Sequence, residues 1–457
     1  KVENTNWNRE GNLMDNQENP RKIALEAIYK IKNQGAYANM VLKDSLNKSR
    51  LKSVDKSLVT GLVYGCVKYR LHLDYVISKF SSVKLKKLSD YVHIILWLGL
   101  YQLMFMDRIP QSAAVNESVK LAKRYAPRSS GFINAILRKA AAEYKNLVWP
   151  SDKTEYLSVY YSYPKDLVEC FINQFGIEEC ESLLIAGNKP SKVTISVNTL
   201  KTTADELLSI LQDEGVKAEK TLLENSIDID TGDVLSLQSY RQGLFTPQGI
   251  TSYLASRVLE PKRDMLVLDL CAAPGGKTVS LAQQMGNKGR VLAFDVHPHK
   301  IELIQQNAMR LGIDITETVC CDSTRPVMQY IEKADRVLVD APCSGLGIIS
   351  KKPDIRYSYS KEMVKTLTEL QYKLLCTGAG YLKKGAKLVY STCTINRAEN
   401  EDVVERFLEE HPDYCIEDIT SYIKPFGKDG SNGYTTFYPL ADNTDGFFIC
   451  AIARRQV

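Results

Sequence analysis

The sequence predicts a multidomain chain in which an all-α front domain and a small α/β middle domain precede a C-terminal α/β domain. Apolar residues recur at helical spacing through residues 20–145, and helix and strand patterns mix over about 151–235. From about residue 245, strand-like runs alternate with helical segments. That alternation is typical of a doubly wound parallel sheet, and 457 residues suffice for several separate cores.

The front domain is predicted over residues 20–148 as a helical bundle. Ile23, Ala27 and Ile31 recur at four-residue steps, and Ser53 offers a start for a later helix. The segment 108–110 contains Pro110 and ends a long apolar helix. Residues 1–19 are polar, rich in asparagine and without an initial Met. We expect them to form a disordered or tag-derived tail.

The middle domain is predicted over residues 151–240. Residues 193–197 alternate as a half-buried strand does, and residues 202–215 form a helical pattern that ends at Gly215.

The C-terminal domain is predicted over residues 245–457. A helix is expected over 300–311, with Gly312 as its stop. The final apolar run, 447–453, is expected to form an edge strand. The other strands are expected at 266–270, 290–296, 317–321, 336–340 and 387–391.

Charge is distributed unevenly along the chain. Residues 20–145 hold 23 lysines and arginines against 8 aspartates and glutamates, whereas residues 146–457 hold 34 against 42. A basic front domain on an acidic body is typical of a protein that binds a polyanion such as a nucleic acid. The alternative is that the lysines only solvate the helices.

The 11 cysteines are odd in number and irregularly spaced. Residues 1–19 do not show a charged leader followed by an apolar segment, so we expect no signal peptide. Since no apolar stretch reaches about 18 residues, we expect a reduced, cytoplasmic protein without disulfides or membrane spans. No C-x-x-C occurs, which disfavours a metal site. We interpret most cysteines as small buried hydrophobic residues. They are Cys66, Cys170, Cys180, Cys320, Cys321, Cys376, Cys415 and Cys450.

A glycine-rich turn, residues 269–278, follows one predicted strand and opens a helix, which is the arrangement of a nucleotide-type cofactor site. The dinucleotide pattern G-x-G-x-x-G is absent. A phosphate-binding loop would match Gly276-Lys277-Thr278, but Cys271 stands where its first glycine belongs and Pro274 stiffens the turn. S-adenosylmethionine, which carries no phosphate, is the third alternative and the one we favour.

Two carboxylates support that cofactor. Asp295 ends the second strand and can accept both ribose hydroxyls, while Asp322 after the third strand can accept from the adenine amino group. The candidate cofactor-binding residues are Cys271, Ala272, Ala273, Pro274, Gly275, Gly276, Lys277, Asp295, Asp322 and Asp340.

Cys343 and Cys393 each follow a predicted strand, at the sheet edge where parallel α/β proteins place their chemistry. A thiolate there can attack C6 of a cytosine, which turns C5 into a nucleophile for a methyl group. Since a free cysteine is mostly protonated at neutral pH, a nearby cation such as Lys277 is expected to favour the thiolate. Lys351, Lys352, Arg356 and Tyr357 follow the first cysteine and are expected to contact flanking nucleotides.

At Pro342-Cys343 and Thr392-Cys393 the sequence resembles the RNA cytosine-C5 methyltransferases. Residues 271–277, 340–345, 352–355 and 445–448 are similar to further motifs of that family. The resemblance implies a Rossmann-like domain that uses S-adenosyl-L-methionine. It also implies Cys393 as nucleophile, Cys343 as helper in product release and Asp340 as the partner of cytosine N3/N4. Thr246-Pro247-Gln248-Gly249 departs from the family pattern, which leaves a contact from that segment open.

Residues 109–117 and 132–138 are similar to the RNA-binding factor NusB. A NusB-like domain ahead of such a catalytic domain is the arrangement of bacterial 16S ribosomal RNA methyltransferases. The resemblance therefore implies 16S RNA as partner, either naked or in an early small-subunit particle. Methylation of tRNA or 23S RNA, and a non-catalytic RNA-binding or assembly factor that retains the cofactor pocket, are the alternatives. The sequence leaves the oligomeric state open.

Overall fold

The computed structural model describes residues 18–231 and 233–456 and divides into two units. The first takes in the chain up to Phe171 together with Lys352–Tyr357, and the second takes in Ile172–Lys351 and Ser358–Val457. The tail predicted over residues 1–19 lies outside the described residues, apart from its last two positions. Asn19 there accepts two backbone hydrogen bonds at the start of helix α1.

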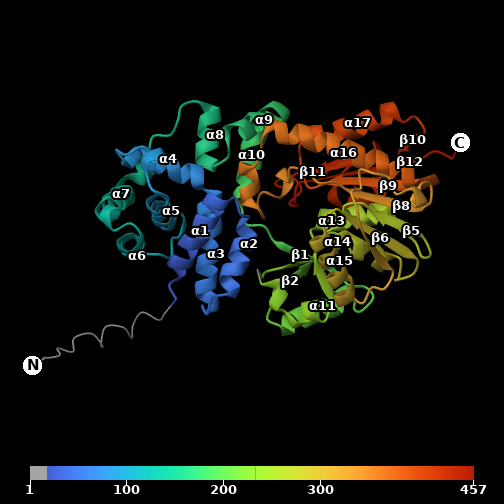
Figure 1. The fold of residues 1–457 in the computed structure, drawn as a ribbon, viewed down its shortest axis with the longest axis horizontal. Helices are drawn as coiled ribbons and strands as arrows, with labels where there is room; N and C mark the ends of the chain where they lie inside the picture. Colours follow the sequence, from blue (N-terminus) through green and yellow to red (C-terminus); the bar gives the residue numbers. More distant parts are fainter. Residues whose placement is uncertain (1–17, 232, 457) are drawn as a thin grey trace, which may run out of the picture. The chain divides into compact units, whose positions relative to one another are not determined.

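The first unit is helical, as the sequence predicts. Helix α5 (Asp90–Phe105) is apolar on nearly every side and is buried among its neighbours (Figure 1). Pro110 separates it from α6 (Gln111–Tyr125), which pairs with α7 (Ser130–Glu143). The other helices up to the unit boundary are α1 (Pro20–Gln34), α2 (Ala38–Asn47), α3 (Ser53–Lys68), α4 (Arg70–Phe80), α8 (Lys153–Tyr161) and α9 (Lys165–Phe175).

The second unit contains a small antiparallel sheet with the strand order β2-β3-β1-β4. Strand β4 (Phe245–Pro247) pairs with β1, so residues 245–247 belong to this sheet, although the sequence places them at the start of the C-terminal domain. The elements of this part are α10 (Ile177–Asn188), β1 (Val193–Val197), α11 (Ala204–Asp213), β2 (Ala218–Lys220), β3 (Ser226–Ile229) and α12 (Gln238–Arg241).

The large sheet of the second unit has the strand order β10-β12-β9-β8-β5-β6-β7, with β11 paired to β12. Strands β9, β8, β5, β6 and β7 run parallel, as the alternating pattern predicts. Their bounds, with the antiparallel strands last, are β5 (Leu266–Asp269), β6 (Arg290–Asp295), β7 (Thr316–Cys320), β8 (Ala334–Asp340), β9 (Leu382–Thr392), β10 (Tyr414–Ile416), β11 (Tyr434–Phe437) and β12 (Phe447–Arg454).

The expectation that the last strand lies at the sheet edge is wrong. Strand β12 pairs with β9 on one side and with β10 and β11 on the other. Strand β10 has three residues and β11 has four, which is too short for a period-two pattern to stand out in the sequence.

Helices cover both faces of the large sheet (Figure 1). Successive strand residues point to opposite faces, so Val337 and Val339 pack with α16 and α17 while Leu338 packs with α13 and α14. The parallel strands consequently end at a common edge, where open α/β sheets place their ligands. The helices are α13 (Ile250–Leu259), α14 (Gly276–Gln284), α15 (Pro298–Leu311), α16 (Lys361–Tyr381), α17 (Glu401–Glu410) and the short α18 (Thr420–Ile423).

None of the helices in the described ranges combines the length and the apolar character that a bilayer crossing requires.

Candidate active site

The two predicted cysteines meet at the carboxyl edge of the large sheet. Cys393 directly follows β9 and Cys343 follows β8, and the two strands are neighbours in which Asp340 is paired with Ser391. The Sγ atoms of the two cysteines lie 3.2 Å apart. This separation brings two potential nucleophiles within contact of one another.

The contact between the thiols changes their acidity. The hydrogen bond with Cys393 and, after it, burial raise the pKa of the Cys343 thiol well above its usual range. Two sulfur atoms this close cannot both carry a negative charge at low cost, because like charges disfavour each other's ionisation. The contact with Cys393 and burial therefore both disfavour ionisation of the Cys343 thiol.

Asp340 lies at the base of the Cys343 loop. Its carboxylate is 2.7 Å from the Lys277 ammonium and accepts a hydrogen bond of 2.8 Å from the Ser391 hydroxyl. Lys277, which the sequence analysis expected to favour a cysteine thiolate, therefore has the Asp340 carboxylate as its ion-pair partner. This ion pair joins the glycine-rich turn to the cysteine loops, since Lys277 belongs to the first turn of α14.

The glycine-rich turn connects β5 to α14. Gly275 has a φ of 99°, and a Cβ atom there would lie 3.2 Å from the Cα of Ile304. The Ala273–Pro274 peptide bond is cis. A Cβ at Gly276 would meet no atom within 4 Å, so the start of α14 faces open space. Backbone N–H groups at such a helix start are available to a ligand.

Asp269, the last residue of β5, is fully buried. The hydroxyl of Thr278 donates to its Oδ2 atom at 2.7 Å, while its Oδ1 atom has no hydrogen-bond partner among the described residues. Burial raises the pKa of Asp269 to about 7.

The remaining predicted carboxylates stand where the next two strands end. Asp295 is 7% exposed and its Oδ1 atom accepts from the backbone N–H of His297 at 3.0 Å. Asp322 is more exposed, and its bonds from the hydroxyl and N–H of Thr324 lower its pKa. Cys271 and Ala272 are packed beside these strands, with Ala272 against Ala293. The turn and the strand ends therefore share one edge of the sheet.

Glu399 and Asn400 are two fully buried residues that the sequence reasoning did not find. Asn400 holds both sides of the Cys393 loop, since it accepts from the Thr392 hydroxyl and donates to the carbonyl of Thr394 at 3.0 Å. The only signal in the sequence is their position six and seven residues after Cys393. An acidic residue just before a helix is more often a solvated charge near the helix start.

Two predicted nucleotide contacts are wrong. Arg356 is fully buried, with its guanidinium 3.8 Å from the centre of the Tyr163 ring, and Tyr357 donates to the carbonyl of Lys68. Both belong to the packed first unit. Lys351 forms an ion pair with Asp445.

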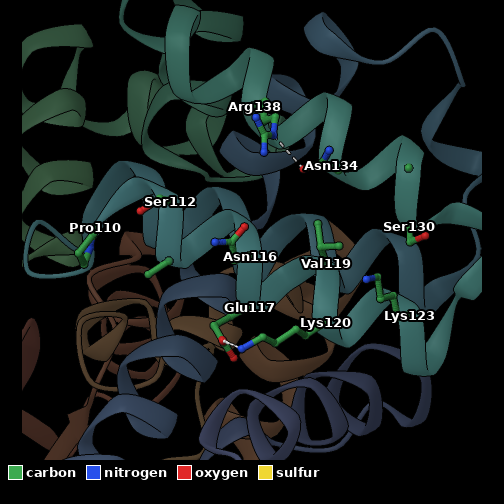
Figure 2. A pocket seen from close by; sticks show the side chains of 12 residues that line it. Pro110, Ser112, Asn116, Glu117, Val119, Lys120, Lys123, Ser130, Asn134 and Arg138 are labelled. Carbon is green, nitrogen blue, oxygen red and sulfur yellow. Dashed lines mark hydrogen bonds and ion pairs between the residues drawn. The ribbon is translucent and has the colours of Figure 1, made fainter.

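A groove lies between α6 and α7 of the first unit, and three of its lining residues are basic (Figure 2). The groove has a volume of about 730 Å³. Lys123 and Arg138 lie exposed at its two ends, while Lys120 is paired with Glu117. The groove is lined by Pro110, Ser112, Ala113, Asn116, Glu117, Val119, Lys120, Lys123, Ser130, Gly131, Asn134 and Arg138.

Comparison with known proteins gives three family matches along the chain. Residues 18–142 match the NusB family and residues 163–233 match the ferredoxin-like domain of RsmF/B-like methyltransferases. Residues 256–453 match the family described as 16S rRNA methyltransferase RsmB/F. A Bacillus subtilis protein named "Probable ribosomal RNA small subunit methyltransferase B" is 36% identical over 95% of this chain and 98% of its own length. The chain belongs to the RsmB/F family of ribosomal RNA methyltransferases.

Other relatives extend over the same length. A Synechocystis protein of the same name is 33% identical over 95% of this chain and 99% of its own. The crystal structure of PH0851 superposes with a TM-score of 0.82 at 27% identity, covering 96% of this chain and 99% of that one. A methyltransferase homologue from Pyrococcus horikoshii has a TM-score of 0.58 at 29% identity and covers 67% of this chain. The helical, ferredoxin-like and methyltransferase domains are thus those of an RsmB/F enzyme.

The cofactor of this RsmB/F enzyme is S-adenosyl-L-methionine, and the sheet edge fits it. The edge offers two kinds of hydrogen-bonding group to a neutral ribose and an amino group. Acceptors are the Asp295 carboxylate and the buried Asp269 oxygen that has no partner among the described residues. Donors are the backbone N–H groups at the open start of α14. Asp295 would hold the ribose, Asp322 the adenine, and residues 271–277 the amino-acid part. When bound, this cofactor supplies an electrophilic methyl group.

Proposed function

We propose that this RsmB/F enzyme methylates C5 of a cytosine in 16S ribosomal RNA through a covalent bond between Cys393 and C6. The observation that carries the proposal is the 3.2 Å contact between two thiols at adjacent strand ends, beside an Asp340–Lys277 pair and the cofactor turn. A single cysteine would suffice for attack, so the second thiol indicates a further step. Work on ribosomal RNA would place the protein in the cytoplasm.

The chemistry begins when the Cys393 thiolate bonds to C6 of the cytosine. Asp340, held by Lys277 and Ser391, faces the N3/N4 edge, where a proton shared between its carboxyl group and N3 takes up the charge that the attack brings into the ring. The electron pair released into the ring makes C5 nucleophilic, and C5 takes the methyl group. The C5 proton then leaves to a base, the ring electrons return, and the C6–S bond breaks.

Cys343 assists the last step. Its raised pKa keeps it protonated, so its S–H can donate to the sulfur of Cys393 as that sulfur leaves as a thiolate. A hydrogen bond to a charged acceptor is stronger than one to a neutral acceptor, so this contact favours release of the product over the bound state. Without Cys343 we expect the covalent intermediate to persist.

The groove between α6 and α7 is our candidate for RNA contact. Lys123 and Arg138 provide charge, and the side-chain amides of Asn116 and Asn134 provide neutral hydrogen-bond donors (Figure 2). This mixture suits phosphate and sugar oxygens, which set position without reading sequence. The extrusion of a cytosine from its stack costs a few kcal/mol, and such backbone contacts offset that cost.

The test is methyl transfer from labelled cofactor to separate transcripts of 16S RNA, 23S RNA and tRNA, followed by mapping of the modified cytosine. We expect label in 16S RNA with the unaltered protein, none with Cys393→Ala, and full labelling with the control Cys415→Ala on β10. Methyl transfer by Cys393→Ala would contradict the assignment of Cys393 as the nucleophile. Label confined to 23S RNA or tRNA would contradict the proposal that 16S RNA is the substrate. RNA binding without any methyl transfer would favour a non-catalytic assembly factor.

A further inference from the structure

A buried carboxylate lies between the two cysteine loops. Glu399 ends the short turn Arg397–Glu399 ahead of α17 and is 0% exposed. A carboxylate is costly to bury unless hydrogen bonds replace its water. Its partners therefore show what the fold gains by burying it.

One set of partners belongs to the Cys343 loop. The Oε1 atom of Glu399 accepts from the backbone N–H of Ser344 at 2.8 Å, and its Oε2 atom accepts from the Ser344 hydroxyl. Gln371 of α16 donates to Oε1 at 3.1 Å and to the carbonyl of Pro342 at 2.9 Å. Glu399 and Gln371 thus hold the residues on both sides of Cys343.

The other set belongs to the Cys393 loop. Oε2 accepts from the Asn396 amide at 3.1 Å and from the Thr394 hydroxyl at 3.5 Å. The hydroxyls of Ser344 and Thr394 are themselves 2.8 Å apart. Ser344 and Thr394 are the chain neighbours of the two cysteines, so one carboxylate joins both loops next to their thiols.

We propose that Glu399 is a positioning residue that sets the spacing between the Cys343 and Cys393 thiols. It acts through Ser344 and Thr394 and touches no reacting atom. The inference rests on the proposed function only in that product release uses both thiols.

A glutamine at this position would not reproduce the contacts. Glutamate offers acceptors on both oxygens, and both are used here by donors. The amide nitrogen of glutamine would face the Ser344 N–H and Gln371 in one orientation, or the Asn396 amide in the other. Two donors would then oppose each other, and the loops would separate.

The experiment measures the thiol spacing directly, without RNA. Diamide takes two electrons and two protons from neighbouring thiols, which form a disulfide while its N=N bond becomes a hydrazine. We expect rapid Cys343–Cys393 linkage in the full chain, detected by peptide mass. In Glu399→Gln the linkage should be at least about 10-fold slower, because small displacements cost much rate. Glu401→Gln is the matched control, since Glu401 accepts from Thr436 instead.

The second variant, Ser344→Ala, removes the hydroxyl that donates to Glu399 but keeps the backbone N–H of residue 344. We expect disulfide formation to be about threefold slower in this variant. It keeps the test decisive if Glu399→Gln does not fold, which a thermal melt would show. Linkage at the unaltered rate in folded Glu399→Gln, or in Ser344→Ala if the first variant is unfolded, would overturn the proposal. Absence of linkage in the unaltered chain would overturn it too. Failure of the proposed function would instead appear as absent methyl transfer with linkage intact.

Discussion

The two cysteine loops and the α6–α7 groove differ in how firmly their functional side chains are held. The loops are tied by buried hydrogen bonds from Glu399 and Asn400, and their thiols touch. The groove carries cations that are exposed on the surface of two helices (Figure 2). Bond formation requires reacting atoms held within tenths of an ångström, whereas phosphate attraction acts over several ångströms and sums over many charges. We therefore expect single changes to abolish function at the loops and only weaken it at the groove.

The largest effect within this comparison is expected from Asp340→Asn. The amide keeps an acceptor for Ser391 but loses the ion pair with Lys277 and cannot share a carboxyl proton with cytosine N3. We expect methyl transfer to fall by about 10²–10⁴-fold in single-turnover assays. Asp335→Asn, at the other end of the same strand, is the control and should retain activity. Near-normal transfer by Asp340→Asn would remove this residue from the mechanism.

The next effect concerns Asp269, whose pKa burial raises to about 7. Between its ordinary pKa of 3.8 and about 7, the folded protein keeps a proton that the unfolded chain loses. Stability from this group is therefore full at low pH and is lost as pH rises toward 7, by up to about 4 kcal/mol. Urea unfolding across this range should show the fall, and Asp269→Asn should reduce it. An identical pH dependence in the variant would contradict the account.

A smaller effect is expected when the groove loses charge. Lys123→Gln with Arg138→Gln should weaken binding to a 16S transcript by about 10-fold and reduce the salt slope by about two. Fluorescence anisotropy at several salt concentrations measures both. Lys30→Gln with Lys43→Gln removes the same charge from α1 and α2. An equal loss in this control would mean that the whole basic unit, not the groove, binds RNA.

The smallest effect is expected from Gly131→Glu. This variant should lower RNA affinity while it raises the stability of the fold. A Cβ at Gly131 meets no atom within 4 Å, so the new side chain fits. Glycine is a poor helix former and an acidic residue suits a first helical turn, so stability should rise by about 0.5–1 kcal/mol. RNA affinity should fall severalfold, because a carboxylate enters the groove. Unchanged affinity with raised stability would show that RNA does not use this surface.

The sequence was sufficient for the features that have a strong local pattern. Apolar strand runs placed the parallel strands, and two cysteine motifs placed each thiol at the end of a strand. That these two strands are neighbours came from the structure. The position of β12 was missed because its partners β10 and β11 are too short to leave a pattern. The domain boundaries and catalytic roles stay predictions.

Burial of polar residues was the other feature that the sequence did not reveal. Arg356 looked like a surface cation after a loop, yet it is buried over the Tyr163 ring. Glu399 was not singled out from the sequence, yet its carboxylate joins the two cysteine loops. Tyr163 is far from Arg356 in the sequence, and Ser344 is far from Glu399, so no local pattern predicts these contacts.

The most direct test of the central claim is isolation of the covalent protein–RNA intermediate. Cys343→Ala should release its product slowly, so incubation with cofactor and 16S transcript should give a denaturation-resistant complex. Nuclease digestion and peptide mass analysis should locate a methylated cytidine on Cys393. Attachment to another residue, or no complex together with normal product formation, would contradict the account.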